Sequence, residues 1–174
     1  MTSPLERYRE LAARVDAFFA RVRARHAGEM VCAAGCDSCC RTRPSVTGVE
    51  GAAIREHLAA LAPGERARLR EQARAAREDR CTALGPDGRC GIYAARPLVC
   101  RSHGVPVRTR DRRSLPVVSS CEKNFVAHGP AAADADCILD QETLSTVLHA
   151  VDATHARETG APAGERVDLA VLLG

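Results

Sequence analysis

The stretch CAAGCDSCCRTRP, Cys32 to Pro44, places four cysteines within nine residues and ends them on an adjacent pair. Three classes of site use cysteines at this density: a disulfide framework, a metal or iron–sulfur site, and the cluster loop of a radical enzyme. We expect a loop here, because four ligand side chains so close together disfavour regular structure. The rest of the chain has to decide between the three classes.

The composition indicates a reduced, metal-binding protein. The chain has 174 residues, 45% of them apolar and 27% charged, which suits one globular domain over residues 1–174. No apolar run approaches the roughly 20 residues that span a bilayer. The first 26 residues alternate charged and apolar side chains, unlike a signal peptide. We therefore expect a cytoplasmic protein, in which nine cysteines, an odd number, favour metal ligation over disulfides.

The charge and the aromatic content argue against a nucleic-acid partner. Eight deprotonated cysteines would lower the formal charge of +3 by eight, to −5. Aromatic residues make up 3% of the chain, which leaves few rings for a base-stacking surface. The sequence also lacks a glycine-rich phosphate loop, a serine-centred motif and a paired-carboxylate signature.

The N-terminal segment predicts an amphipathic helix over residues 4–26. Ser3 and Glu6 form a capping box, and apolar residues from Leu5 to Val22 follow at alternating spacings of three and four. This stripe would either dock on the core of the chain or form the seam of a homodimer.

Later segments predict further helices and a hairpin. Helices are expected from a capping box at Thr47, from Pro63, where we expect an exposed helix, and over residues 140–157 with Asp140 as the cap. VPVRT and LPVVSS flank RDRRS and predict a small β-hairpin, and RVDLAVLLG predicts a short strand. The fold class is therefore α-rich with a small β-hairpin, with irregular cysteine-rich loops around a metal centre and amphipathic helices on either side. Residues 32–125 would form the metal-binding region.

The first three cysteines also have the spacing of a radical-SAM cluster loop. Cys32, Cys36 and Cys39 form C-x3-C-x2-C, with which those enzymes hold a 4Fe–4S cluster and leave one iron open. Here the loop follows a helix rather than a strand, and the chain shows no alternating series of strands and helices. A self-contained radical enzyme is therefore not favoured.

Cys40 distinguishes this loop from a simple three-cysteine motif. Neighbouring side chains on an extended backbone point apart. Cys39 and Cys40 are therefore not expected to bind the same mononuclear metal, but to serve two metal positions or one polynuclear site. A vicinal disulfide is the alternative, although its ring is strained and needs oxidation.

Four later cysteines complete the expected ligand set. The eight metal ligands are Cys32, Cys36, Cys39, Cys40, Cys81, Cys90, Cys100 and Cys121. Eight thiolates fit two four-thiolate sites or one larger cluster, and zinc and iron–sulfur are the soft-ligand candidates. Structural zinc sites often use two C-x2-C motifs. This chain has a single C-x2-C motif, Cys36 and Cys39. We therefore expect an iron–sulfur cluster, 4Fe–4S, or another iron centre, with Zn²⁺ as the alternative.

The spaced cysteines and one later string resemble a known family. CAAGCDSCC is followed by CTALGPDGRCGIYAARPLVCRSHG and by SSCEKNF, over residues 32–125. These elements are similar to the CxxCxxCC cysteine-cluster proteins, also called YkgJ-like, which are described as zinc- or iron-chelating domains. The matching positions of the later string are Cys90, Ile92, Tyr93, Arg96, Pro97, Cys100 and Arg101. Three residues, not two, separate the first two cysteines here, and Cys137 has no counterpart, so we leave it outside the ligand set.

The resemblance implies metal binding without a settled reaction. We expect Arg96 and Arg101 to neutralise or hydrogen-bond the thiolates, and Tyr93 to cover the cofactor. His103 is expected to be structural rather than a ligand. A redox, sensing or metal-handling role with a redox or metal-transfer protein partner is expected. A structural zinc interaction module and a cluster-dependent enzyme are the alternatives.

Overall fold

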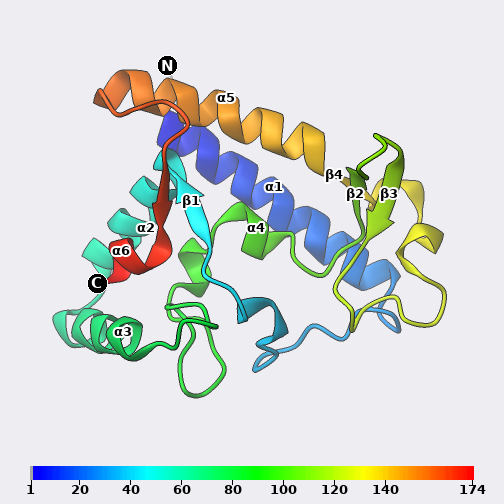
Figure 1. Cartoon of the computed structure of the whole chain (residues 1–174), viewed down its shortest axis with the longest axis horizontal. Helices are drawn as coiled ribbons and strands as arrows, with labels where there is room; N and C mark the ends of the chain where they lie inside the picture. The colour runs from blue at the N-terminus through cyan, green and yellow to red at the C-terminus, as the bar shows by residue number, and fades with distance from the viewer. Residues whose placement is uncertain (1) are drawn as a thin grey trace. The chain divides into compact units, whose positions relative to one another are not determined.

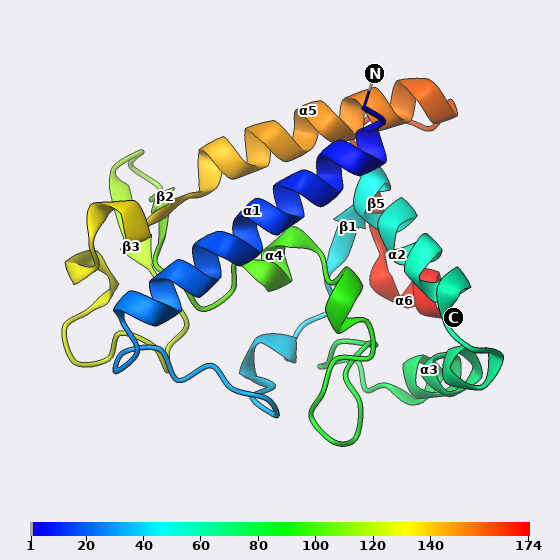
Figure 2. The same cartoon turned by 180° about the vertical axis from the view of Figure 1, so that it is seen from behind.

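The computed structural model describes residues 2–174 and is rich in helix, with two small sheets (Figures 1 and 2). The α-helices are α1 Pro4–Arg25, α2 Gly48–Ala60, α3 Pro63–Ala75, α4 Leu98–Arg101, α5 Gln141–Thr159 and α6 Leu169–Leu173. The strands are β1 Ser45–Thr47, β2 Val107–Arg110, β3 Pro116–Ser119, β4 Leu139–Asp140 and β5 Arg166–Asp168. Four 3₁₀-helices are η1 Ser38–Cys40, η2 Tyr93–Ala95, η3 Pro130–Ala132 and η4 Ala135–Cys137. The cysteines of the first loop and of residues 81–90 lie in short turns and loops, so the expected fold class is confirmed.

The chain forms two compact units, each assembled from separate segments. Unit 1 contains the start of the chain up to Tyr8, Ala34–Pro97 and Val151–Gly174, and unit 2 contains Arg9–Ala33 and Leu98–Ala150. Each unit has its own cluster of buried apolar residues. A single domain over residues 1–174 stays a prediction.

Unit 1 is built on the antiparallel pair β1 and β5, which lie side by side in Figure 1. Val46 of β1 is fully buried, together with Ile54 of α2 and Leu169 of α6. The expected C-terminal strand forms, but only its first three residues are extended, and the rest turn into α6. The helix that begins at Pro63 also packs against α6, since Leu69 and Ala73 are buried; the prediction that it is exposed is wrong for this face.

The N-terminus of α2 is satisfied by two carboxylates. Glu50 accepts a hydrogen bond from the backbone N–H of Thr47 at 2.9 Å, which confirms the capping box. Asp152 of α5 accepts from the N–H of Val49 at 2.9 Å, and its side chain is buried. A Cβ on Gly48 would lie 3.3 Å from Asp152 Oδ1, so glycine gives this carboxylate room to reach the helix end.

Unit 2 is built on a three-stranded sheet in the order β3–β2–β4. The antiparallel pair β2 and β3 confirms the predicted hairpin (Figure 1). The parallel strand β4 was not expected, because two residues show no alternation that a sequence pattern could reveal. The core of this unit consists of buried apolar residues from α1, η4 and the loops of the unit: Val22, Met30, Val105, Phe125, Ala133 and Cys137.

The two long helices begin at the residues that the capping patterns predict. Glu6 accepts from the N–H of Ser3 at 2.7 Å, at the start of α1. Asp140 accepts from the N–H of Thr143 at 2.8 Å, at the start of α5. Val22 of the α1 stripe is fully buried in the unit 2 core, as a docked helix requires, while the homodimer seam stays a prediction. Within residues 2–174, each helix is too short or too polar to cross a membrane.

Candidate metal centre

The adjacent cysteines lie in a 3₁₀ turn, not in an extended segment. Cys39 and Cys40 are the last two residues of η1, and the N–H of Cys40 donates to the carbonyl of Asp37 at 2.8 Å. Their sulfur atoms lie 4.0 Å apart. The premise that the two side chains point apart is therefore wrong, because the backbone here is not extended and the two sulfurs lie in contact. Two thiolates on one tetrahedral zinc ion would stand about 3.8 Å apart.

Cys81 and Cys90 lie at the two ends of a narrow loop in the same unit. Leu84 and Cys90 form an isolated antiparallel bridge, and the N–H of Gly91 donates to the carbonyl of Ala83 at 2.7 Å. Between them, the N–H of Gly88 donates to the carbonyl of Gly85 at 3.1 Å, which is the turn that Gly85-Pro86-Asp87-Gly88 predicts. This loop returns the chain on itself and keeps the two cysteines close to one another.

Backbone and side-chain contacts join this loop to η1. The N–H of Cys81 donates to the carbonyl of Cys40 at 2.8 Å. Asp37 and Arg80, the neighbours of the two cysteine segments, form an ion pair at 3.4 Å. The fold of unit 1 thus brings together cysteines that are about 40 residues apart in sequence.

The four thiols of Cys39, Cys40, Cys81 and Cys90 act on one another electrostatically. The hydrogen bond with Cys39 raises the pKa of Cys40 above its usual range, and burial and the charges of Cys39, Cys81 and Cys90 add to this effect. Burial is also the main cause that raises the pKa of Cys81 and of Cys90. The raised pKa values favour the neutral thiols of Cys40, Cys81 and Cys90 without a metal, so a metal ion would bind there with the release of protons.

The four sulfurs belong to neighbouring segments but do not converge closely enough to surround a single metal ion. Among residues 2–174, no three of the predicted cysteine ligands have sulfur atoms that all lie within 4.8 Å of one another. Cys81 is buried, Cys40 and Cys90 are half-buried, and Cys39 is exposed. We call Cys39, Cys40, Cys81 and Cys90 the unit 1 thiol group.

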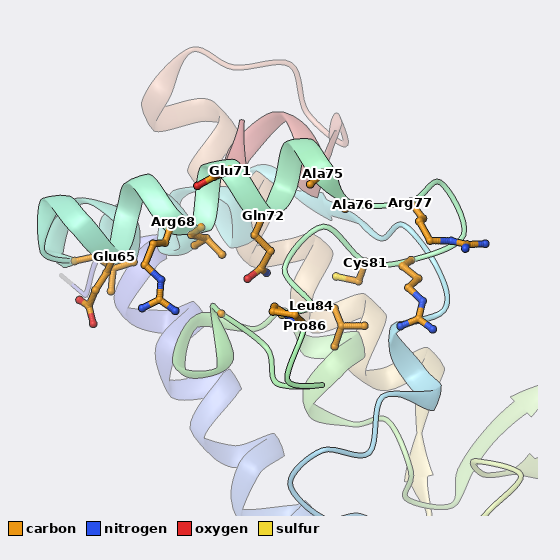
Figure 3. A pocket seen from close by; sticks show the side chains of 15 residues that line it. Glu65, Arg68, Glu71, Gln72, Ala75, Ala76, Arg77, Cys81, Leu84 and Pro86 are labelled. Carbon is orange, nitrogen blue, oxygen red and sulfur yellow. The ribbon is translucent and has the colours of Figure 1, made fainter.

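A groove of about 620 Å³ lies beside this group (Figure 3). One wall is α3, from which Gln72 projects, and the opposite wall is the loop that carries Leu84 and Pro86. The side chain of Cys81 lines the same groove. The Nε2 atom of Gln72 is buried and makes no hydrogen bond within the described residues. The groove is therefore an approach to the thiol group with an unsatisfied donor in its wall.

In unit 2, protein groups hold Cys32 in place. The buried amide of Asn124 donates to the Cys32 sulfur at 3.2 Å and to the carbonyl of Gly104 at 2.8 Å, and its oxygen accepts from the N–H of Val31 at 3.0 Å. Gly104 has a φ of +103°, and a Cβ there would lie 2.9 Å from the Cys32 sulfur. Glycine is thus required for both the backbone conformation and the space.

A scan against protein-family models matches residues 31–122 to the CxxCxxCC family, described as "Putative zinc- or iron-chelating domain". The matched segment covers more than half of the 174 residues. The chain belongs to this family. All eight predicted ligands lie within the CxxCxxCC segment, whereas Cys137 lies outside it. No curated protein and no solved structure was found to match the chain. Chelation of zinc or iron by a cysteine-rich domain is therefore the function that membership in the CxxCxxCC family supports.

The other predicted cysteines of the CxxCxxCC segment are distributed over both units. Cys36 is half-buried and precedes η1 in unit 1. Cys100 lies in α4 of unit 2, and the carbonyl of Cys121 accepts from the N–H of Asn124 at 2.9 Å. Within unit 2, Asn124 therefore connects Cys121 to Cys32.

The predicted cofactor-binding residues have other contacts as well. The Arg96 guanidinium lies 4.0 Å from the centre of the Tyr93 ring, and Tyr93 is 63% exposed. Arg96 also lowers the pKa of Cys90, although burial outweighs it. Arg101 forms an ion pair with Asp16 of α1, and His103 is exposed. Their roles at a cofactor stay predictions.

Sequence reasoning did not single out Asn124 or the pair of Asp37 and Arg80. Asn124 lies within SSCEKNF, three residues after Cys121, so it was close to an identified motif. An asparagine has no ligand signature, and its role follows only from partners about 90 residues away in the chain. For the ion pair, the sequence offered one indication, namely that Asp37 directly follows Cys36 and Arg80 directly precedes Cys81.

Proposed function

We propose that this member of the CxxCxxCC family holds an iron–sulfur cluster, or another polynuclear iron centre, through its cysteine thiolates. The observation that carries the proposal is the unit 1 thiol group, in which two distant segments of the chain bring four cysteine sulfurs together. A purely sulfur donor set favours iron–sulfur clusters and zinc over hard cations.

The spread of these sulfurs supports a polynuclear centre over a single zinc ion. A mononuclear tetrahedral site needs all four sulfurs about 3.8 Å apart. Within residues 2–174, the pair Cys39 and Cys40 meets this separation, but no third predicted cysteine lies within 4.8 Å of both sulfurs. A cluster distributes its ligands over several iron atoms and so accepts a wider group of thiolates. The single C-x2-C pair in the sequence agrees with this preference.

Neighbouring charges fit a strongly anionic centre. Four thiolates carry four negative charges, and Arg96 already favours the anionic form of Cys90. Arg80 lies next to Cys81 and is held by Asp37 beside η1. We propose that Arg96 and Arg101 offset the charge of the centre, that Tyr93 shields it, and that Cys32, Cys36, Cys100 and Cys121 complete the ligand set.

The groove beside Cys81 supports a redox, sensing or metal-handling role. It gives a partner protein, or a metal ion that enters or leaves, a path to the thiol group. It also favours a second candidate, a cluster-dependent enzyme, because the buried Gln72 Nε2 could bind an acceptor group of a small substrate. In either case we expect the protein to act in a reducing compartment, the cytoplasm, where its thiols are available.

Anaerobic purification of the full chain, followed by analysis of iron, acid-labile sulfide and zinc, tests the proposal. We expect iron and sulfide together with a visible absorption band that bleaches with dithionite. Zinc alone, with neither iron nor sulfide after anaerobic reconstitution, would overturn it and leave the structural zinc module. Cys90→Ser should lower the iron content, whereas Ser38→Ala, in the same turn as Cys39, should keep it.

A further inference from the structure

A second set of metal-ligand side chains meets in unit 2, outside the CxxCxxCC segment. His26, Asp134 and Cys137 offer a ring nitrogen, a carboxylate oxygen and a sulfur that all lie within 4.8 Å of one another. Among residues 2–174, no other set of His, Cys, Asp and Glu side chains meets this distance. His26 precedes the segment 31–122, and the other two follow it. We call this set the His26–Asp134–Cys137 triad.

Short local structures hold each member of the triad in position. His26 continues the last turn of α1, and its N–H donates to the carbonyl of Val22 at 2.9 Å. Asp134 is the N-cap of η4 and Cys137 its last residue, joined by an N–H···O hydrogen bond of 2.8 Å. This hydrogen bond closes the turn and keeps Asp134 and Cys137 near one another, with their ligand atoms within 4.8 Å.

The triad leaves a buried nitrogen without a partner. The Nε2 atom of His26 is inaccessible to solvent and makes no hydrogen bond within the described residues. The nearest acidic oxygen, Oδ2 of Asp134, is 3.6 Å away, beyond hydrogen-bond range. An unsatisfied buried polar atom destabilises the fold, and a metal ion would supply the missing interaction. Nitrogen and oxygen ligands of a tetrahedral zinc ion stand about 3.4 Å apart, close to the observed separation.

The charges around the triad balance a divalent ion. A neutral His26 with anionic Asp134 and Cys137 offsets the two charges of Zn²⁺. Arg25 Nη1 donates to both carboxylate oxygens of Asp136 at 2.7 Å. The same nitrogen lies 3.8 Å from Oδ2 of Asp134 and 4.0 Å from the Cys137 sulfur, beside two of the three proposed ligands. A donor beside a ligand sulfur is the kind of outer contact that orients a thiolate. Arg21 donates to the carbonyl of Asp136 at 2.9 Å and adds a second link between α1 and η4.

We propose that His26 Nε2, Asp134 Oδ2 and Cys137 Sγ bind one Zn²⁺ ion, with water as the fourth ligand. Mixed nitrogen, oxygen and sulfur donors suit zinc, which is of borderline softness, and not an iron–sulfur cluster. The side chain of Asp134 is 59% exposed, so water has access to one side of the site, while Cys137 is fully buried. The ion joins the end of α1 to η4 and so stabilises unit 2. The site is independent of the iron centre proposed above.

Cadmium-113 NMR and zinc analysis of the full chain test this site. The protein is loaded with ¹¹³Cd²⁺ or with Zn²⁺ alone after chelator treatment under reducing conditions. We expect one cadmium resonance typical of a single sulfur ligand, well separated from any signal of a site with several thiolates. Asp134→Asn and His26→Gln should each remove this resonance and one equivalent of zinc. His128→Gln, on an exposed histidine in the same unit, should change neither.

Unchanged zinc stoichiometry and an unchanged cadmium spectrum in both Asp134→Asn and His26→Gln would overturn the proposal. The exposure of Asp134 makes it the decisive variant, since an exposed carboxylate is replaced with little risk to the fold, whereas Cys137→Ser alters the core. The result is separable from the iron proposal, because Cys90→Ser should leave the single-sulfur resonance in place. Loss of iron without loss of this resonance would affect only the unit 1 thiol group.

Discussion

The unit 1 thiol group and the sulfurs of unit 2 are held in place in different ways. In unit 1, Cys39, Cys40, Cys81 and Cys90 contact or act on one another, and their mutual effects favour neutral thiols. In unit 2, Cys32 receives a hydrogen bond from Asn124, and Cys137 lies beside Arg25 and Asp134. Thiols that disfavour each other's charge ionise only when a metal ion binds them, whereas the Cys32 sulfur is held by the Asn124 amide without a metal ion.

The largest effect is expected from Cys40→Ser, which tests the dependence of unit 1 on metal. The hydroxyl is a harder and much less acidic ligand than a thiolate, so most of the metal bound at the unit 1 thiol group should be lost. Stability should fall with it, since metal binding and folding are coupled. Metal analysis and thermal denaturation measure both effects. Wild-type metal content in Cys40→Ser, with Ser38→Ala as the reference, would remove Cys40 from the ligand set.

The next effect is expected from Asn124→Ala, which removes the protein support of Cys32. The change leaves the N–H of Val31 and the carbonyl of Gly104 without their partners inside unit 2. We expect a loss of about 3 kcal/mol of unfolding free energy, measured by urea denaturation of the metal-free protein. A similar loss confined to the metal-bound protein would contradict the view that Asn124 supports Cys32 without a metal ion.

Gly104→Ala should be milder and isolates the space around the Cys32 sulfur. The new Cβ would approach that sulfur to 2.9 Å and the Asn124 amide nitrogen to 3.0 Å. Positive φ adds strain, for a total of about 2 kcal/mol. Gly129 also has a positive φ, of +77°, but a Cβ added there would have no atom within 4 Å. Gly129→Ala therefore measures the cost of the backbone strain alone. Equal urea midpoints for the two variants would show that the close approach to Cys32 carries no cost.

The smallest effect is expected at Asp140, the N-cap of α5 in unit 2. The hydrogen bond from the backbone of Thr143 lowers the pKa of Asp140 below its usual value. Because the pKa is lower in the folded state, this stabilisation is present above the unfolded-state pKa of about 3.9 and is lost as pH falls through the folded-state value. Asp140→Asn should therefore be slightly less stable than wild type at pH 7, with a difference that disappears in acid. Thermal denaturation of both proteins from pH 7 down to acid pH measures the difference in stability. A difference that persists in acid, or a loss of metal in Asp140→Asn, would contradict this prediction.

Local signals in the sequence determined much of the secondary structure. The capping boxes at Ser3 and Thr47, the proline at Pro63 and the turn at Gly85 each act within four residues, so their patterns can be read directly. The hairpin was predicted for the same reason. The two-residue strand β4 and the burial of one face of α3 were not, because they depend on partners elsewhere in unit 2 and unit 1.

The sequence by itself also determined the chemical class of the site, since cysteine spacing and the string from Cys90 to Arg101 indicate a sulfur-rich chelating domain of the CxxCxxCC family. Only the tertiary structure decided that the sulfurs of Cys39 and Cys40 lie 4.0 Å apart, because a 3₁₀ turn and an extended segment can carry the same residues. It alone brought Cys81 to Cys40 and His26 to Asp134 and Cys137. Side chains separated by about 40 or 110 residues meet through the packing of whole segments, and no spacing rule along the chain encodes that meeting.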